Sequence, residues 1–435
     1  MAAQNLIHIN KVTCNFEREP LLAPFGFKGA YLTELWQSVV HITSASGKEG
    51  LGLGTQSVLW SDANVFKENS ESAGNALMFA LTSFAAKQIQ SLCYSNPLSL
   101  VEEVFTPSLD YGRAITCKPD LRITFVFNAL VPLDNAVWQL YCQENNIASF
   151  DEMVPAEFRH GLSYRHDRLA LIPLVSYGVP VEQVVEMVRG GVSVLKIKIG
   201  CDPDGDGDLE KTLSWDIQRV ASIHNAVAGF ETPYTDCGHV VYYLDANGRY
   251  DSRERLVQLL ESLETSGALE RVILLEEPFP EGADIDVSDL PVRIAADESA
   301  HSAQHVARLI DLGYGAIALK PAAKTLSETL RILSLAHEKG VPCFCADLTV
   351  NPVLVDWNKN VAARLAPLPG VKIGLLEMNG DQNYRNWERM CSYHPRNGAT
   401  WMKPNRGVFV LDESFYESSG GILEQSDHYR ALVVR

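Results

Sequence analysis

The chain has no hydrophobic run long enough to cross a membrane. Its longest apolar stretch, around Ala76 to Ala86, is short and is interrupted by Thr82 and Ser83. Positive charge is also scarce, because 37 Lys and Arg residues stand against 54 Asp and Glu residues, for a formal net charge of −17. A surface of that sign repels phosphate, which excludes nucleic acid as a partner. Residues 1–15 lack the basic start and apolar core of a signal peptide, so we expect a cytoplasmic protein without a membrane partner.

Cysteine and histidine lack the spacings of a metal or redox site. The nine cysteines are odd in number and scattered. The closest pair, Cys343 and Cys345, has neither the redox C-x-x-C spacing nor that of a zinc knuckle, so we expect reduced thiols. The eleven histidines form no metal-ligand pattern.

Residues 1–160 are predicted to form an α+β domain. Two apolar, β-branched segments joined by a Gly-containing turn indicate a hairpin, and helical periodicity follows. The hairpin segments are 36–46 and 51–60, and the helical segments are 74–92 and 128–144. Gly50, Gly52 and Gly54 resemble a dinucleotide-binding loop, but no helix-opening pattern follows them. We interpret them as turn and strand glycines.

From about Leu169 short apolar runs alternate with amphipathic helical segments. The eight runs are 170–176, 193–199, 240–244, 272–275, 293–296, 316–319, 342–346 and 372–376. The helical segments between them include 181–189, 216–226, 252–262, 303–311 and 326–338. This rhythm is typical of a (β/α)8-type barrel, a modified TIM barrel, which we place at residues 161–400. Residues 401–435 contain no further barrel unit and are predicted to return to the first domain.

The most informative motif is Lys196-Ile-Lys198, which lies in the apolar run Val194–Ile199. Two lysines two positions apart on a strand point to the same side. Burying two ammonium groups side by side is costly, so such a pair indicates either a lysine with a lowered pKa or an anion in front of it.

Further charged residues follow the later runs at the same relative position. They are Asp245, Glu276, Asp297 and Lys320, each directly after a short apolar run. In a barrel the carboxyl ends of the strands meet at one mouth, so these side chains are expected to converge there. Three carboxylates at one point repel one another unless a cation lies between them, and Mg²⁺ suits oxygen ligands of this kind. Lysines on either side then suit removal of a proton α to a carboxylate.

In order and spacing these motifs resemble the enolase superfamily. The likeness is to the muconate-lactonizing-enzyme and dipeptide-epimerase branch of the mandelate racemase/muconate lactonizing enzyme family, over about residues 25–400. The matching motifs are Lys196-Ile-Lys198, Asp245-Ala-Asn247, Glu276-Glu277-Pro278, Ala296-Asp297-Glu298-Ser299 and Leu319-Lys320-Pro321. The segment Leu133–Gln139 also resembles a helix of that family's capping domain, with Gln139 in place of an aspartate.

The resemblance implies an α+β capping domain over the barrel mouth, a bound Mg²⁺, a small-molecule carboxylate substrate and a homo-oligomer. It implies that Asp245, Glu276 and Asp297 hold the metal, with Glu276 rather than Glu277 as the ligand of its motif. Phe25-Gly-Phe27 and the Gly52–Thr55 turn are the candidate lids. Candidate substrate contacts are Asn247, Glu298, Asp347, Glu377 and Asn379.

Two strand ends depart from the family pattern. Dipeptide epimerases commonly have D-x-D after the eighth strand to hold an ammonium group, whereas this chain has Glu377-Met-Asn379. One acid remains, which allows a cationic substrate group but disfavours a dipeptide. The seventh strand ends in Cys345-Ala-Asp347, without the histidine base of the mandelate racemase branch, which favours chemistry between two lysines.

The first functional hypothesis is a racemase or epimerase that acts α to a carboxylate through an enediolate. Lys198 and Lys320 act on opposite faces, and Lys196 tunes the pKa of Lys198 and contacts the substrate carboxylate. The alternative at the same site is a dehydratase or cycloisomerase acting on a hydroxy or sugar acid. A Schiff-base aldolase using Lys320 is a third hypothesis, and a catalytically silent binding protein is disfavoured by the complete set of site residues.

Overall fold

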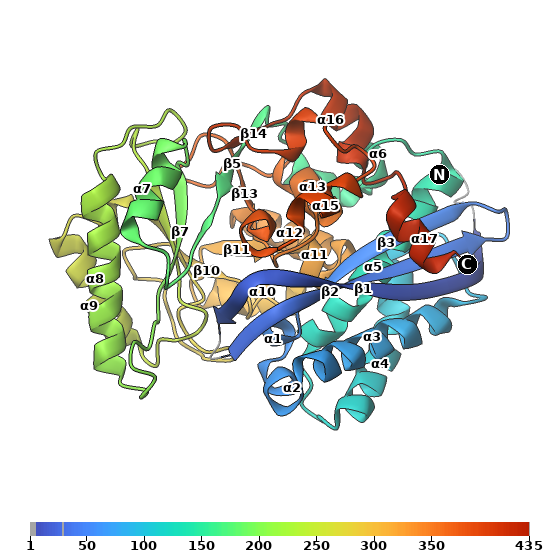
Figure 1. Ribbon diagram of the computed structural model, residues 1–435, viewed down its shortest axis with the longest axis horizontal. Coiled ribbons are helices and arrows are strands. Elements are labelled where there is room, and N and C mark those ends of the chain that lie inside the picture. The colour runs from blue at the N-terminus through green and yellow to red at the C-terminus, as the bar shows by residue number, and fades with distance from the viewer. Residues whose placement is uncertain (1–5, 28–29, 435) are drawn as a thin grey trace.

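The computed structural model describes residues 6–27 and 30–434 of the chain. The first part of the chain forms a four-stranded antiparallel sheet in the order β3-β2-β1-β4. The strands are β1 (Ile7–Phe27), β2 (Ala30–Ser44), β3 (Glu49–Gln56) and β4 (Cys93–Tyr94). β1 and β2 form a long ribbon that reaches from the cap towards the barrel (Figure 1). The predicted hairpin is confirmed as β2 and β3, although the second strand ends at Gln56 rather than Trp60.

Helices complete the cap. They are α1 (Val58–Ser61), α2 (Ala63–Glu68), α3 (Glu71–Ile89), α4 (Pro97–Thr116), α5 (Ile123–Asn145) and α6 (Phe150–Met153), followed by the 3-10 turn η1 (Ala156–Leu162). α3 and α5 confirm the two predicted helices. No helix among the described residues combines the length and apolar character that are needed to cross a bilayer.

The glycines of β3 allow α5 to pack directly on the strand. A Cβ atom at Gly52 would lie 1.9 Å from the carbonyl oxygen of Pro132 and 2.3 Å from the amide nitrogen of Ala136. Only a residue without a side chain fits such an approach. The interpretation of these residues as turn and strand glycines is correct. The prediction of Gly52–Thr55 as a lid is wrong, because this segment is a buried strand under α5.

The second part of the chain is the predicted barrel, and all eight predicted strands are present. The parallel strands are β5 (Arg168–Ile172), β6 (Leu174–Val175), β7 (Val194–Lys198), β8 (Val241–Asp245), β9 (Val272–Glu276), β10 (Ile294–Ala296), β11 (Ala316–Leu319), β12 (Cys343–Cys345) and β13 (Gly374–Glu377). They follow the order β5-β13-β12-β11-β10-β9-β8-β7-β6. β5 and β6 stand at opposite ends of that order, but along the chain only Pro173 separates them. Proline has no backbone N–H and so cannot donate a hydrogen bond to a neighbouring strand. They form one interrupted strand, and the sheet closes into a barrel.

The barrel helices lie outside the strands and include those predicted from periodicity. They are α7 (Val181–Arg189), α8 (Leu209–Val227), α9 (Arg253–Thr265), α10 (Ala303–Asp311), α11 (Pro321–Lys324), α12 (Leu326–Glu338), α13 (Pro352–Ala362), α14 (Gly380–Asn383) and α15 (Trp387–Ser392), with the turn η2 (Leu269–Arg271).

The C-terminal segment touches both parts of the molecule. It comprises η3 (Thr400–Met402), β14 (Val408–Val410), α16 (Glu413–Ser418), η4 (Ser419–Gly421) and α17 (Asp427–Val433). β14 pairs antiparallel with β5 of the barrel. α17 contacts β1 and β2 of the cap. The domain limits at residues 160 and 400 stay a prediction.

A buried joint connects the cap to the barrel. Asp134 of α5 accepts hydrogen bonds from the amides of Leu326 and Ser327 at 2.7 and 3.1 Å, at the start of α12. Trp138, one turn further along α5, donates to the Ser327 hydroxyl at 3.0 Å. Since the first amides of a helix have no partner within it, Asp134 caps α12 from the other domain.

Replacing Asp134 with alanine is expected to lower the free energy of unfolding by about 3 kcal/mol, because buried amides lose their acceptor. Chemical denaturation measures this. The matched variant Asp120→Ala removes an exposed carboxylate and should change stability by less than about 0.5 kcal/mol. Equal effects of the two substitutions would contradict the role of Asp134 as an interdomain cap.

Candidate active site

The barrel strands bring the predicted site residues to one level at their carboxyl ends. Lys198 pairs in register with Asp245, and Asp245 pairs with Glu276, across β7, β8 and β9. Asp297 and Lys320 come one residue after β10 and β11. The two lysines Lys198 and Lys320 therefore stand on either side of three consecutive carboxylate-bearing strands, as predicted.

Lys196 lies at the centre of the carboxylates. Its ammonium is 3.0 Å from Asp245 Oδ2, 2.9 Å from Glu276 Oε2 and 3.1 Å from Glu377 Oε2. It also lies 4.6 Å from the centre of the Tyr243 ring. Burial lowers the pKa of Lys196, but the three carboxylates outweigh it and hold that pKa well above its usual value. Lys196 is thus a fixed positive charge.

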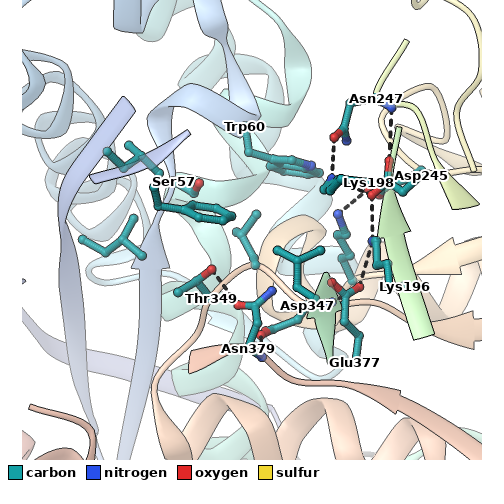
Figure 2. A pocket seen from close by; sticks show the side chains of 17 residues that line it. Ser57, Trp60, Lys196, Lys198, Asp245, Asn247, Asp347, Thr349, Glu377 and Asn379 are labelled. Carbon is teal, nitrogen blue, oxygen red and sulfur yellow. Dashed lines mark hydrogen bonds and ion pairs between the residues drawn. The ribbon is translucent and has the colours of Figure 1, made fainter. Parts of the chain in front are cut away.

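Lys198 and Lys320 each bind the carboxylate of a neighbouring strand. Figure 2 shows Lys198 beside Asp245 and Asn247. Lys198 Nζ donates to Asp245 Oδ2 at 2.6 Å and to the side-chain oxygen of Asn247. Lys320 Nζ donates to Asp297 Oδ2 and lies 5.0 Å from the centre of the Trp60 ring. Burial lowers the pKa of Lys320, but Asp297 and the glutamates beside it raise it above its ordinary value.

The charges around the three carboxylates shift their pKa values in different directions. Burial raises the pKa of Asp245 and of Asp297, yet the adjoining lysines dominate and hold both pKa values far below the usual range. Glu276 is the exception, because burial and the neighbouring Asp245 raise its pKa well above the ordinary value. Glu276 is therefore the one of these three carboxylates whose negative charge the lysines do not fully compensate.

The carboxylate oxygens of this site are of the kind that binds a divalent cation. In the described ranges no group of three or more His, Cys, Asp and Glu side chains is arranged to hold a metal ion as it stands. The ammonium groups of Lys196 and Lys320 lie against these carboxylates. Glu276 Oε1 and Asp297 Oδ1 are buried oxygens that no hydrogen-bond donor among the described residues reaches. Unsatisfied carboxylate oxygens are the ligands that a hard cation takes, so Asp245, Glu276 and Asp297 could hold one once the ammonium groups move aside.

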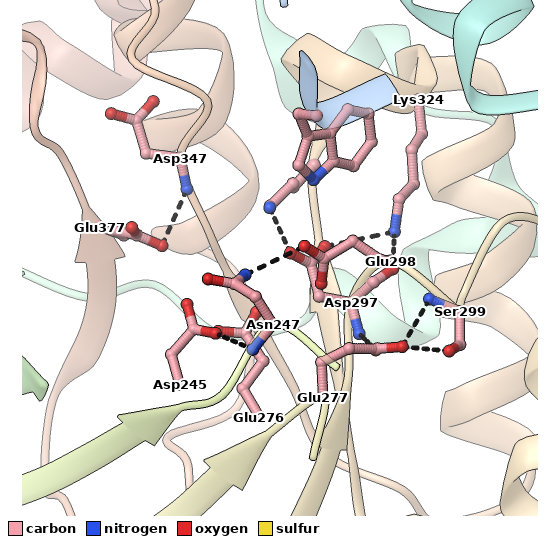
Figure 3. A network of polar contacts seen from close by, with 12 residues as sticks. Asp245, Asn247, Glu276, Glu277, Asp297, Glu298, Ser299, Lys324, Asp347 and Glu377 are labelled. Carbon is pink, nitrogen blue, oxygen red and sulfur yellow. Dashed lines mark hydrogen bonds and ion pairs between the residues drawn. The ribbon is translucent and has the colours of Figure 1, made fainter. Parts of the chain in front are cut away.

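The Glu277 carboxylate is engaged away from this cluster. Its backbone has a φ of +41°, which turns the side chain away from Glu276 (Figure 3). The Glu277 carboxylate accepts from the amides of Asp297 and Ser299 at 2.8 and 3.1 Å and from the Ser299 hydroxyl. Burial raises its pKa to about 8. Glu277 thus holds the loop that carries Asp297.

The five predicted substrate contacts fall into two places. Asn247 bridges Lys198 to Glu298, since its amide nitrogen donates to Glu298 Oε1 at 3.0 Å. Asp347, Glu377 and Asn379 line the cavity at the ends of β12 and β13. Glu298 is not among the residues that line it, so its prediction as a substrate contact stays a prediction.

A cavity lies between the cap and the strand ends. The cap residues on its wall are Phe25, Leu32, Leu35, Ser57 and Trp60. Phe25 belongs to the predicted lid Phe25-Gly-Phe27, whose Phe27 side chain lies outside the described part of the chain. Sequence reasoning missed the other four, because only the fold brings β2 and α1 to the barrel mouth.

Sequence reasoning also did not identify Lys324 as a residue of the site. Its ammonium donates to the backbone oxygen of Asp297 at 2.6 Å and lies 3.6 Å from Asp297 Oδ1. Burial lowers its pKa. The spacing Lys320-Pro-Ala-Ala-Lys324, one helical turn after the strand, is the signal that could have identified it.

A carboxylate behind the site ties two of its loops together. Asp216 of α8 accepts from the amide of Gly200 at 2.7 and 2.8 Å, just after the lysine strand. It also accepts from the Tyr250 hydroxyl at 2.8 Å, in the loop that follows Asp245. Asp216 therefore fixes the loop after β7 relative to the loop after β8.

The Asp216 carboxyl should make stability depend on pH. Burial raises its pKa to about 7, although the hydrogen bonds from Gly200 and Tyr250 act against this. The folded state then holds the proton more tightly than the unfolded state, whose pKa is about 4, so this contribution is present below about pH 4 and is lost as pH rises through 7. Asp216→Asn should flatten the unfolding free energy between those limits, whereas Asp208→Asn on the same helix should not. Parallel pH profiles of wild type and Asp216→Asn would contradict this.

Residues 180–372 match the family model described as enolase C-terminal domain-like. Similar solved structures include the dipeptide epimerase of Enterococcus faecalis V583 complexed with Mg and L-Leu-L-Tyr, at 18% identity and a TM-score of 0.64, covering 93% of this chain and 98% of that one. The L-talarate dehydratase of Polaromonas sp. JS666 complexed with Mg and L-glucarate has 17% identity and a TM-score of 0.64, with 99% and 98% covered. The L-Ala-D/L-Glu epimerase of Bacillus subtilis has 17% identity and a TM-score of 0.61, with 87% and 92% covered. A comparison with curated proteins found no match.

Proposed function

We propose that this chain is a member of the enolase superfamily, and that it is a Mg²⁺-dependent racemase or epimerase that acts on the carbon α to a carboxylate. The observation that carries the proposal is the placement of Lys198 and Lys320 on either side of Asp245, Glu276 and Asp297 at one level of the barrel mouth. Removal and return of a proton at one carbon needs a base on each face, and this arrangement supplies both.

Asp245, Glu276 and Asp297 are the residues that would hold the metal. Bound Mg²⁺ supplies positive charge next to the substrate carboxylate, where negative charge develops as the α-proton leaves. Structures with this fold from E. faecalis and Polaromonas are complexed with Mg. The unsatisfied oxygens of Glu276 and Asp297 support the same assignment for this chain.

Each of the two lysines carries out one of the two proton transfers. Lys198 as a neutral amine takes the α-proton and becomes an ammonium, while the electrons of the C–H bond move into the carboxylate to give an enediolate. Lys320 as an ammonium returns a proton to the opposite face, which re-forms the C–H bond with inverted configuration. The reverse reaction exchanges the two roles.

Other residues hold the reactants in place and keep out water. Lys196 remains charged between Asp245, Glu276 and Glu377, so it is suited to orient the substrate carboxylate. The Trp60 ring, together with Leu32 and Leu35 of the cap, covers the reacting groups. A site closed to water strengthens the electrostatic interactions within it.

A dehydratase is the second candidate. The observation that favours it is the fold shared over nearly the full chain with the Polaromonas L-talarate dehydratase. In that reaction one lysine removes the α-proton and a β-hydroxyl leaves as water. The cycloisomerase alternative has no comparable observation in its favour, and the cytoplasmic location and homo-oligomeric state stay predictions.

Product analysis separates these reactions. A set of amino acid derivatives, dipeptides and sugar acids is incubated with the protein and Mg²⁺, and each mixture is followed by polarimetry and proton NMR. Inversion at the α-carbon without loss of mass supports the racemase or epimerase. Formation of a keto acid with loss of water would instead establish the dehydratase.

A further inference from the structure

The ring of Trp60 lies over two lysine side chains at the edge of the site. Trp60 belongs to α1 of the cap, is buried and reaches into the cavity (Figure 2). The centre of its ring is 5.0 Å from Lys320 Nζ and 5.9 Å from Lys324 Nζ, which are cation–π distances. Because α1 is a single turn of four residues, its own hydrogen bonds do not fix this ring relative to the barrel. Contacts with other elements therefore set the position of Trp60.

Arg122, at the start of α5, makes such a contact. Its Nη1 donates to the backbone oxygen of Trp60 at 3.3 Å. Its own amide donates to Asp62 Oδ2 at 3.1 Å, while Asp62 Oδ1 accepts from the first amides of α2. The side chain and the backbone of Arg122 are thus both bound to the short segment that carries Trp60.

The same guanidinium crosses from the cap to the barrel. Arg122 Nη2 forms an ion pair with Glu281 Oε2, in the loop that follows β9. That oxygen also lies 3.0 Å from His301 Nε2, in the loop that begins with Asp297 after β10. Arg122 therefore joins the Trp60 segment of the cap to two loops at the mouth of the barrel.

A second cavity lies beside this ion pair, between the cap and the barrel loops. Most of the residues that line it are polar, and they include Asp62, Asn64, Lys67 and Arg122 of the cap and Glu277, Pro280 and Glu281 of the barrel. Apolar packing therefore does not set the distance between cap and barrel at this place. The two paired side chains are 22% and 26% exposed, and a charge-assisted hydrogen bond that is partly shielded from water is suited to hold that distance.

We propose that Arg122 is a positioning residue, which holds Trp60 against Lys320 only while its guanidinium is paired with Glu281. When the pair breaks, the cap segment that carries Trp60 moves away from the barrel and Lys320 becomes accessible. For the proposed reaction this means that the cap completes the surroundings of one of the two lysines. The ion pair and its effect on Lys320 do not depend on that reaction.

Lys198 provides an internal reference for this effect. Its ammonium is held by Asp245 and Asn247, which both belong to the barrel. Movement of the Trp60 segment leaves these partners in place. A change that is confined to Lys320 therefore reports on the contact between cap and barrel rather than on the barrel itself.

Acetylation of the full chain by acetic anhydride, resolved by residue with mass spectrometry, measures how readily each lysine is reached and needs no substrate. Arg122→Gln should raise the acetylation rate of Lys320 by about fivefold and leave that of Lys198 unchanged, since the loss of a partly exposed ion pair permits local opening. Glu281→Gln should have the same effect. The double variant should show no larger effect than either single variant, because both substitutions break one ion pair.

Two further variants serve as controls. Arg122→Lys keeps the positive charge, but a single amine does not span Glu281 and the Trp60 oxygen as a guanidinium does, so it should restore only part of the protection. Arg253→Gln removes an ion pair with Asp289 within the barrel and should change the acetylation of neither site lysine.

Unchanged acetylation of Lys320 in both Arg122→Gln and Glu281→Gln overturns the inference. An equal rise at Lys198 also overturns it, because the whole site would then have loosened. Effects of the two substitutions that add in the double variant would show that they do not act through one contact. If Arg122→Gln does not fold, Glu281→Gln decides the question, since it leaves the hydrogen bonds within the cap in place. None of these outcomes bears on whether the protein is a racemase or epimerase.

Discussion

Replacing Lys198 with alanine is expected to lower the rate of α-carbon inversion by about 10³-fold or more while one half of the reaction survives. The remaining base, Lys320, still exchanges the α-proton of the stereoisomer that presents it on that side. Lys320→Ala should show the opposite stereoisomer preference. Proton NMR of each pure stereoisomer in D₂O measures both exchanges directly.

Lys211 offers a matched control for these substitutions. It is a surface lysine of α8 that is held by Asp204 and Asp206 at 2.6 and 2.7 Å, away from the cavity. Lys211→Ala should leave both exchange rates unchanged. Normal exchange of both stereoisomers by Lys198→Ala and by Lys320→Ala would show that the bases are wrongly assigned.

Loss of one carboxylate should remove metal binding and activity together. Asp245→Asn keeps the size of the side chain but removes the charge that attracts a divalent cation. Mg²⁺ affinity measured by calorimetry is expected to fall by at least about 100-fold, and turnover by about 10³-fold, since the metal contributes several kcal/mol to the reaction.

The outcome of this substitution must be separated from damage to the fold, because Asp245 is buried against Lys196 and Lys198. Thermal unfolding of Asp245→Asn supplies that check. Asp251→Asn, at an exposed position a few residues further on, serves as the matched control. Undiminished activity of the Asp245 variant in metal-free buffer would refute the metal assignment.

The barrel could be predicted from the sequence because each strand is a short apolar run that ends in a charged residue or a turn. The cap could be predicted only in part. β1 was missed, since Glu17, Arg18 and Glu19 interrupt its apolar pattern. Their charges are accommodated by partners on other elements, for example Arg18 by Glu34 of β2 and Glu19 by Arg389 of α15. Such partners leave no local signal.

The difference between local sequence patterns and contacts that only the fold creates also explains which site residues could be predicted. Lys198, Asp245, Glu276, Asp297 and Lys320 all occupy one structural position, the end of a barrel strand, which spacing along the chain reveals. Trp60 and Ser57 reach the cavity only because β3 ends at Gln56 and α1 turns towards the barrel mouth. The false lid at Gly52–Thr55 arose because a glycine that permits close packing looks the same in a sequence as one that permits a turn.

The central claim is that this chain uses a divalent cation and two lysines to remove and return the proton α to a carboxylate. Deuterium incorporation at the α-carbon of an acid substrate in D₂O tests it most directly, with Mg²⁺ present and then after chelation. We expect incorporation with Mg²⁺, loss of incorporation on chelation and recovery when Mg²⁺ is added back. A turnover that leaves the α-proton in place, or an exchange that continues unchanged in chelator, would contradict the account.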